Sequence, residues 1–315
     1  MIEAVLILLV PVALYLPGHF LGGSLVLKGD GWAELALLRL SCAIAVATPV
    51  LLALALLRWY RTPVLLGSFV VAAIAAWTLA PRGARPGRRP AGRWDLALYA
   101  LVVASFSLYA NPAEYVLKDR DPGVYAVVAA KLARTGELFT RDGLVAAVAS
   151  FHDFADGAKH PSFFIRGDNL LVPQFFPGPF ALIGVGNLVG GTWGGLYLVP
   201  VFGALAVGAA FLLGSELFGR WAGFLGAALL ATSYAQVWWS RYPSSEVLTQ
   251  FFVLAGLWLA ARFLRGGGGG TGLVAGLLLG GAIWCGWTPF WPRSRYRCLS
   301  RTISSSGARC GGGLT

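Results

Sequence analysis

Four charged residues in a row open the stretch KDRDPGVY, at residues 118–125, between two long apolar blocks. Two carboxylates two positions apart, Asp119 and Asp121, can hold a divalent cation or bridge a metal ion to a phosphate. A carboxylate beside a reacting hydroxyl can also act as a general base. The pair Asp121-Pro122 equally has the chemistry of a helix start, because Asp is a favoured N-cap and Pro a favoured first helical residue. The stretch is therefore a candidate for chemistry, for a helix cap, or for both.

Three further polar residues lie where apolar segments begin. Gln174 stands in LVPQFFPGPFALIGVG, and Arg241 and Glu246 stand in WWSRYPSSEVL. Near a membrane boundary, an arginine and a glutamate can bind an anionic lipid head group or a sugar. Either side chain alone can equally be an interface anchor or half of a salt bridge. These residues are candidates for substrate binding.

Histidine offers one more candidate site. His152 and His160 lie in FHDFADGAKHPSFF, where acidic neighbours could complete a metal site. Histidines in a polar loop are also often simply exposed to solvent, and both interpretations stay open. The four cysteines show no C-x-x-C or other metal-binding spacing, and they imply no disulfide framework.

The composition is typical of a membrane protein. Of 315 residues, 57% are hydrophobic and 12% are charged, whereas soluble domains carry roughly 25% charged residues. Continuous apolar runs of about 20 residues recur, and only helices or closed barrels satisfy their backbone in lipid. We therefore predict an all-α fold, a polytopic transmembrane helical bundle with about eight or nine spans. The expected spans are 2–17, 33–57, 63–80, 95–110, 173–190, 194–214, 221–239, 246–264 and 271–287.

The positive charge is concentrated in two places. The net charge is +11, but five arginines crowd into residues 82–93 and five more lie between residues 293 and 309. A short arginine-rich loop is typical of the cytoplasmic side of a membrane protein. Placing the first group there puts residues 111–172, a polar segment rich in acidic residues, on the exterior face. We expect this long loop to carry amphipathic surface helices, and we expect membrane lipids rather than nucleic acid as partners.

The orientation of the later helices depends on the segment 173–190. Simple alternation of spans places Arg241 and Glu246 in the cytoplasm. Counting positive charges places Arg220 inside instead, and it returns the other two residues to the exterior face. A short, glycine-rich 173–190 segment that does not cross the membrane reconciles the two, and we favour that arrangement.

The chain divides into three regions. Residues 1–94 are expected to form N-terminal transmembrane helices and the basic loop, and residues 95–290 a transmembrane core with the exterior loop. The segment 291–315 is a basic Ser/Arg/Gly tail that contains no carboxylate side chain. We interpret this tail as disordered, or as the product of a reading-frame shift that leaves the chain truncated at its C-terminus.

Asp121 is expected to begin a helix that lies along the exterior membrane surface. The stretch that follows, VYAVVAAKLART, is amphipathic, and Gly136 is a typical C-terminal stop. The apolar side of this helix comprises Val124, Val127, Val128 and Leu132.

Together these stretches resemble the GT-C superfamily of membrane glycosyltransferases, in particular the protein O-mannosyltransferases and the aminoarabinose lipid A transferases. DPGVYAVVAAKLARTGEL resembles the acidic motif of their first exterior loop, with Asp121 four residues before Tyr125. QFFPGPFALIGVG resembles the opening of the next span, and SELFGRWAGFLGAALLATSYAQVWWSRYPSSEVL is similar to the helix pair that follows. The resemblance covers about residues 95–265, over half of the chain.

The resemblance implies a glycosyltransferase of the cell membrane. Such an enzyme moves a hexosyl or pentosyl group from a polyprenyl-phosphate donor to a hydroxyl of a lipid, glycan or protein acceptor at the exterior face, with inversion. It implies Asp121 as the base, with Asp119 assisting through a divalent ion, Mg²⁺ or Mn²⁺, or by orienting the acceptor. The implied substrate-binding residues are Tyr125, Arg120, Lys118, Gln174, Arg241 and Glu246. The candidate metal ligands are Asp119, Asp121 and His160.

One departure and two alternatives accompany this interpretation. The aminoarabinose transferases carry Glu where Gln174 falls, so a second carboxylate or metal ligand of that group is missing here. A transporter or flippase for lipid-linked sugars is the main alternative, but that class places charges near the bilayer centre. Here the charges gather in the exterior loop instead. The other alternative is a catalytically inactive, truncated membrane protein.

Overall fold

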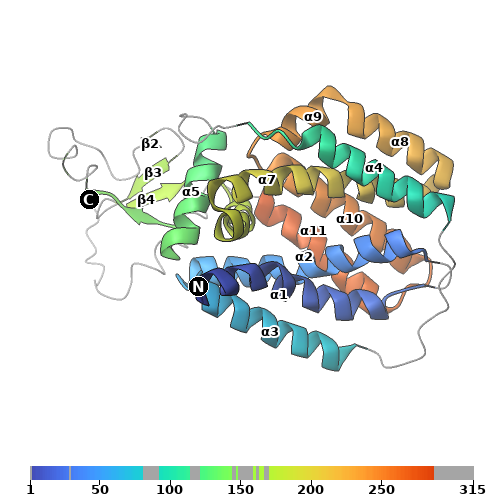
Figure 1. Ribbon diagram of the computed structural model, residues 1–315, viewed down its shortest axis with the longest axis horizontal. Helices are drawn as coiled ribbons and strands as arrows, with labels where there is room; N and C mark the ends of the chain where they lie inside the picture. The colour runs from blue at the N-terminus through green and yellow to red at the C-terminus, as the bar shows by residue number, and fades with distance from the viewer. Residues whose placement is uncertain are drawn as a thin grey trace, which may run out of the picture.

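The protein folds into a bundle of helices with a small sheet at one end (Figure 1). The computed structural model describes residues 2–27, 30–80, 92–113, 121–143, 147, 159–160, 163–166 and 170–286. The helices are α1 (Ile2–Ser24), α2 (Trp32–Leu56), α3 (Thr62–Leu79), α4 (Arg93–Tyr109), α5 (Asp121–Thr135), α7 (Pro177–Phe218), α8 (Arg220–Thr232), α9 (Tyr234–Arg241), α10 (Glu246–Leu264) and α11 (Gly269–Cys285). The predicted helical bundle is confirmed.

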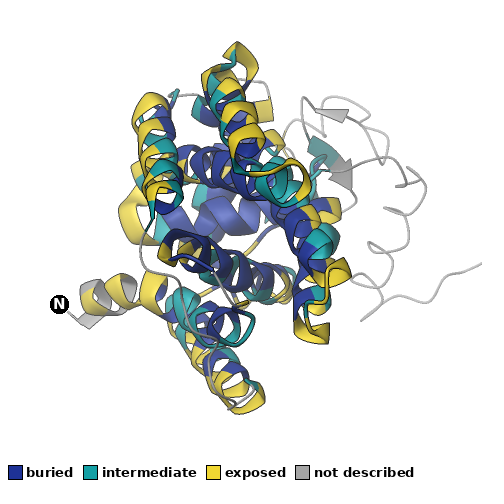
Figure 2. Cartoon of the chain, turned by 90° about the vertical axis from the view of Figure 1, so that its right-hand side faces the viewer, coloured by how far each residue is buried: buried dark blue, intermediate teal, exposed yellow. Residues whose placement is uncertain are grey.

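Four of these helices are long and apolar enough to cross a membrane, namely α2, α3, α7 and α10. Shorter apolar helices occupy Leu8–Ser24 and Gly269–Cys285. Buried residues gather at the centre of the bundle, whereas exposed residues lie on its outer side (Figure 2). Many exposed residues are large and apolar, such as Val71 at 67% and Leu229 at 72% exposure. A surface of this kind suits contact with lipid. The length and composition of these helices are therefore those of a membrane protein. The number of spans, eight or nine, stays a prediction.

Two predicted boundaries are wrong. The first helix does not stop at Pro17 but continues to Ser24 with two prolines inside it. Prolines are tolerated inside membrane helices because neighbouring helices satisfy the freed backbone groups. The predicted span 221–239 is divided into α8 and α9 at Ser233, whose hydroxyl accepts a hydrogen bond from the Gln236 N–H at 3.3 Å. The predicted break between the spans 173–190 and 194–214 is confirmed, because α7 consists of two helical parts that meet at Gly190 and Gly191, where the backbone is not helical.

Gly18 marks a close crossing of α1 and α2 rather than a helix end. A Cβ atom at this position would overlap the Arg39 carbonyl oxygen and the Ala43 backbone. We expect Gly18→Ala to lower the free energy of unfolding by about 1–3 kcal/mol, because the backbones must separate. Gly23→Ala is the matched control in the same helix, since its nearest neighbour would be the Arg39 guanidinium at 3.9 Å. Chemical or thermal unfolding in detergent measures both variants, and equal stability would contradict the packing argument.

The long loop that we expect at the exterior face contains a small sheet that was not predicted. Its strands are β1 (Thr140–Arg141), β2 (Lys159–His160), β3 (Phe163–Arg166) and β4 (Leu170–Pro173), in the antiparallel order β1-β4-β3-β2. Lys131 of α5 joins the sheet to the helix, because its Nζ donates to the Phe139 carbonyl at 2.7 Å and to the Thr140 hydroxyl. Figure 1 shows α5 standing across one end of the bundle, with the strands beyond it.

Different charged side chains lie at the two ends of the bundle. The end opposite α5 holds three ion pairs: Arg220–Glu34 at 2.9 Å, Arg262–Asp30 at 2.7 Å and Arg265–Glu216 at 3.1 Å. The arginine-rich 82–93 loop joins this end, because α4 begins at Arg93 and its Asp95 accepts a hydrogen bond from the Ala33 N–H of α2 at 3.4 Å. Arg241 lies at the other end, where it donates to the Leu108 carbonyl. This sorting matches the arrangement that positive-charge counting favours.

The kink in α7 explains why Arg220 and Arg241 lie at opposite ends of the bundle. The part before Gly190 packs beside α5 and is seen nearly end-on in Figure 1, whereas the later part runs along the bundle. The two parts meet closely at Gly186 and Gly194, each of which leaves no space for a side chain. We therefore expect that the first part of α7 does not add a full membrane crossing of its own.

Candidate functional site

The candidate site is built around the start of α5. This helix begins at Asp121, as predicted, and its Asp121 side chain is exposed. Val124, Val128 and Leu132 are buried against the bundle, but Val127 is 43% exposed, so its assignment to the apolar side is wrong. The predicted stop is confirmed: Gly136 has a φ of +76° and donates its N–H to the Leu132 carbonyl at 2.8 Å. The helix thus carries one exposed carboxylate at its first residue.

Tyr125 lies one turn beyond Asp121 and faces the interior. Its side chain is only 4% exposed. The ring packs between two phenylalanines, with centroid separations of 5.0 Å to Phe175 and 5.3 Å to Phe180. These contacts hold the phenol in a fixed position, because aromatic pairs at such distances attract one another. Tyr125, the aromatic residue of the predicted motif, therefore forms the buried part of the candidate site.

The Tyr125 hydroxyl joins α5 to the start of α10. Burial raises the pKa of this phenol well above its ordinary value, and the negative charges of Glu246 and Asp121 raise it further. A hydrogen bond with the Ser245 side chain opposes this shift. The phenol therefore remains protonated at neutral pH and can donate a hydrogen bond. Two carboxylates from helices far apart in the sequence lie close enough to act on the same hydroxyl.

The end of α11 completes the site. A Cβ atom on Gly286, which has a φ of +150°, would lie 3.1 Å from the Ser245 hydroxyl and 3.4 Å from that of Thr249. The hydroxyls of Ser244 and Thr249 are buried and have no hydrogen-bond partner within the part of the chain that the structure describes. Glu246 is exposed beside them. The site is thus a cluster of hydroxyls below two accessible carboxylates.

Sequence reasoning missed the hydroxyl residues of this cluster. The signal was present, because Pro243-Ser244-Ser245-Glu246 is a typical helix start. Nothing in that pattern indicates that the serines would face Tyr125. Only the tertiary fold, in which Tyr125 of α5 approaches Ser245 at the start of α10, brings them together.

Arg241 and Gln174 lie at the same end of the bundle but have structural partners. The Arg241 guanidinium donates to the Leu108 carbonyl, and its backbone carbonyl accepts a hydrogen bond from the Ala113 N–H at 2.7 Å. Its Nε is buried without a partner in the described residues. Gln174 donates to the Phe163 carbonyl of β3 at 3.4 Å. The structure therefore brings together Asp121, Tyr125 and Glu246, and it places Arg241 and Gln174 in supporting contacts.

Several predicted site residues cannot be placed. Lys118, Asp119 and Arg120 lie outside the described residues, as does the side chain of His160. Across the segments that the structure describes, there is no group of three or more His, Cys, Asp or Glu side chains that could hold a metal ion. Asp121 and Glu246 are two accessible carboxylates, and Mg²⁺ is often held by one or two carboxylates together with substrate phosphates and water. The described donors therefore fit a substrate-bridged ion better than a site made of protein ligands alone.

Comparison of the chain with family models, with curated proteins and with solved structures finds no match.

Proposed function

We propose that this protein is an integral membrane glycosyltransferase. It transfers a sugar from a polyprenyl-phosphate donor to an acceptor hydroxyl at the exterior face of the cell membrane. The observation that carries the proposal is the pair of exposed carboxylates, Asp121 and Glu246, whose charges both raise the pKa of the buried Tyr125 hydroxyl, at the bundle end that lacks the arginine-rich loop. A soluble acceptor can reach such carboxylates while the donor lipid stays in the membrane.

The proposed reaction is a single inverting displacement. The acceptor oxygen attacks the anomeric carbon and forms the new glycosidic bond. The bond from that carbon to the phosphate oxygen breaks, and its electron pair leaves with the polyprenyl phosphate. Asp121 takes the acceptor proton. The polyprenyl phosphate is a good leaving group once its charge is neutralised, so it needs no general acid. Glu246 and the Tyr125–Ser245 pair position the sugar hydroxyls through hydrogen bonds.

The charge of the leaving phosphate requires a cationic partner. Arg241 is the described cation nearest in sequence to Glu246, and its buried Nε still lacks a partner among the described residues. Lys118 and Arg120 precede Asp121 directly and are further candidates. A divalent ion held by Asp121, Asp119 and the donor phosphate would supply the same neutralisation when bound.

The breaks in two helices favour a second candidate, a transporter for lipid-linked sugars. Transporters often build their sites from discontinuous helices, and here α7 is kinked at Gly190–Gly191 and the α8–α9 pair is interrupted at Ser233. A transporter site would also need polar groups near the bilayer centre. The described ion pairs lie at one end of the bundle instead, which favours chemistry at the interface.

Membranes that contain the chain, supplied with radiolabelled polyprenyl-phosphate sugars and with lipid, glycan and protein acceptors, test the proposal. We expect label to move from the donor into an acceptor fraction and free polyprenyl phosphate to accumulate in equal amount. Membranes from cells without the chain are the control. Movement of intact donor between leaflets of sealed vesicles, with no transfer, would identify the transporter instead.

A further inference from the structure

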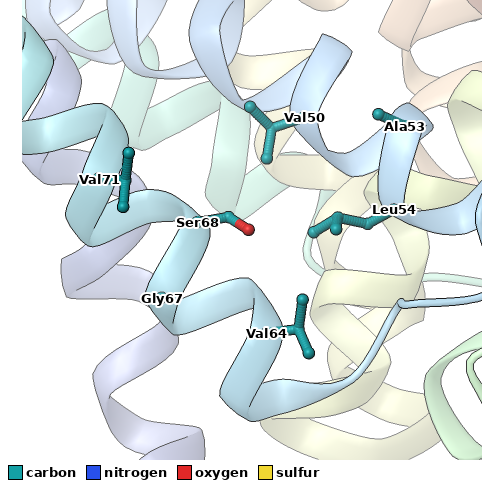
Figure 3. A pocket seen from close by; sticks show the side chains of 7 residues that line it. All are labelled: Val50, Ala53, Leu54, Val64, Gly67, Ser68 and Val71. Carbon is teal, nitrogen blue, oxygen red and sulfur yellow. The ribbon is translucent and has the colours of Figure 1, made fainter.

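An open, apolar groove runs between α2 and α3 on the outside of the bundle (Figure 3). Its volume is about 590 Å³, within the roughly 300–1,000 Å³ that small-molecule sites occupy. The lining residues are Val50, Ala53, Leu54, Val64, Gly67, Ser68 and Val71. Ser68 is the one lining side chain that carries a polar group. The groove therefore has the chemistry of a binding site for a hydrocarbon chain.

Two arginines flank the end of this groove at the α2–α3 turn. Arg61 is the N-cap of α3, three residues before Val64 and seven before Ser68, so it stands above the same face of the helix. Arg58 follows Leu54 by four residues and has a φ of +63°. Both side chains are exposed, and neither is in an ion pair with another described residue. Two cations with no ion-pair partner among the described residues thus stand where the apolar groove ends.

The same turn has the features of a membrane interface. Trp59, between the two arginines in sequence, is 59% exposed, and exposed tryptophans are enriched at the head-group level of bilayers. The turn is held rigidly, because the Tyr60 hydroxyl donates to the Ala181 carbonyl of α7 at 2.6 Å. The pKa of Lys131 is lowered, mainly by burial and further by the charge of Arg58, so α5 brings another cation close. The negative charge of the nearby Glu137 partly opposes this lowering of the Lys131 pKa.

We propose that the α2–α3 groove and its turn bind an anionic phospholipid, with one acyl chain between the helices and the phosphodiester on Arg58 and Arg61. The proposal is independent of the glycosyltransferase function. It also differs from donor binding, because Gly136 at the end of α5 packs on this turn, where an added Cβ atom would lie 3.4 Å from Arg61 Cγ, while Asp121 begins the helix. A 15-residue helix separates the two places, or about 22 Å at about 1.5 Å per residue.

The bound lipid would hold the surface helix against the membrane. The α2–α3 turn contacts the end of α5, and α5 carries Asp121 and Tyr125 at its other end. An anionic head group at the turn neutralises the charges that Arg58, Arg61 and Lys131 bring together. The exposed Arg134 in the last turn of α5 can approach the same head group.

Lipid binding to the purified chain tests this proposal. Native mass spectrometry in detergent, with phosphatidylglycerol or phosphatidylcholine added at increasing concentration, measures the affinity for each. We expect phosphatidylglycerol to bind more tightly. The double variant Arg58→Asn/Arg61→Gln should bind it about 30-fold more weakly, as expected from two cations near an anionic surface. Asn suits position 58 because it tolerates a positive φ.

A second variant blocks the groove without touching the charges. A Cβ atom on Gly67 meets nothing within 4 Å, so Gly67→Leu fills the groove without a clash, and leucine is a better helix former than glycine. We expect this variant to lose phosphatidylglycerol binding. Gly276→Leu in α11 is the matched control, since its Cβ atom also meets nothing within 4 Å. The double variant Arg93→Gln/Arg265→Gln is the control for the arginine variant, because it removes two positive charges from the opposite end of the bundle. It should bind phosphatidylglycerol as tightly as the parent does.

Three results would overturn the proposal. Equal affinity for the two phospholipids would remove the role of the arginines. Unchanged binding in Gly67→Leu would place the lipid elsewhere. Displacement of phosphatidylglycerol by a stoichiometric amount of polyprenyl phosphate would make the groove the donor site instead.

Discussion

Asp121→Asn is expected to lower sugar transfer by about 10²–10⁴-fold, the usual contribution of a positioned general base. The variant removes the group that accepts the acceptor proton and keeps the shape of the side chain. It should fold normally, because Asn is as favourable as Asp at the start of a helix. Initial rates of label transfer from polyprenyl-phosphate sugar, normalised to the amount of folded protein, measure the effect.

Two neighbouring carboxylates make this test specific. Glu137→Gln neutralises an exposed carboxylate just beyond the other end of α5 and should leave transfer unchanged. Glu246→Gln should reduce transfer less than Asp121→Asn does, because Glu246 is assigned to sugar binding. Full activity in Asp121→Asn together with loss of activity in Glu246→Gln would move the base to Glu246. Full activity in both variants would remove the carboxylate pair from the mechanism.

The parts of the fold that depend on local chemistry were predictable. The start of α5 at Asp121 and its end at Gly136 follow from cap preferences, which act over a few residues. The apolar runs indicated the helices, because helix length in a membrane is set by bilayer thickness. The glycine-rich start of α7 was also recognised as unusual, and the structure shows the kink at Gly190 and Gly191.

The parts that depend on tertiary contacts were not predictable. Pro17 and Gly18 have the signature of a helix end, yet α1 continues because α2 packs directly on Gly18. The sheet was missed because its strands have only two to four residues each, and pairing over such short lengths leaves little periodicity. Ser245 entered the site only because the tertiary fold brings the start of α10 to Tyr125 of α5.

The Arg262–Asp30 pair is expected to be a large single contribution to stability. The side chains are only 5% and 11% exposed, and Arg262 Nη2 lies 2.7 Å from Asp30 Oδ2. Asp30 also accepts a hydrogen bond from the Leu27 N–H at 2.8 Å, and the guanidinium lies over the Trp258 ring, 5.3 Å from its centroid. The pair joins α10 to the loop between α1 and α2. Arg262→Met should lower the free energy of unfolding by about 3–5 kcal/mol, because it leaves a buried carboxylate without its partner.

A double variant separates the interaction energy of the Asp30–Arg262 pair from the cost of leaving either charge buried alone. Asp30→Asn/Arg262→Met should be more stable than the sum of the two single changes predicts, because neither charge is then left buried alone. Arg265→Met is the matched control: Arg265 pairs with Glu216 at 3.1 Å, but its side chain is 56% exposed. An exposed pair contributes about 0–1 kcal/mol, so this variant should unfold almost as the parent does. Equal losses in Arg262→Met and Arg265→Met, measured by denaturant unfolding in the same detergent, would show that burial does not strengthen the first pair.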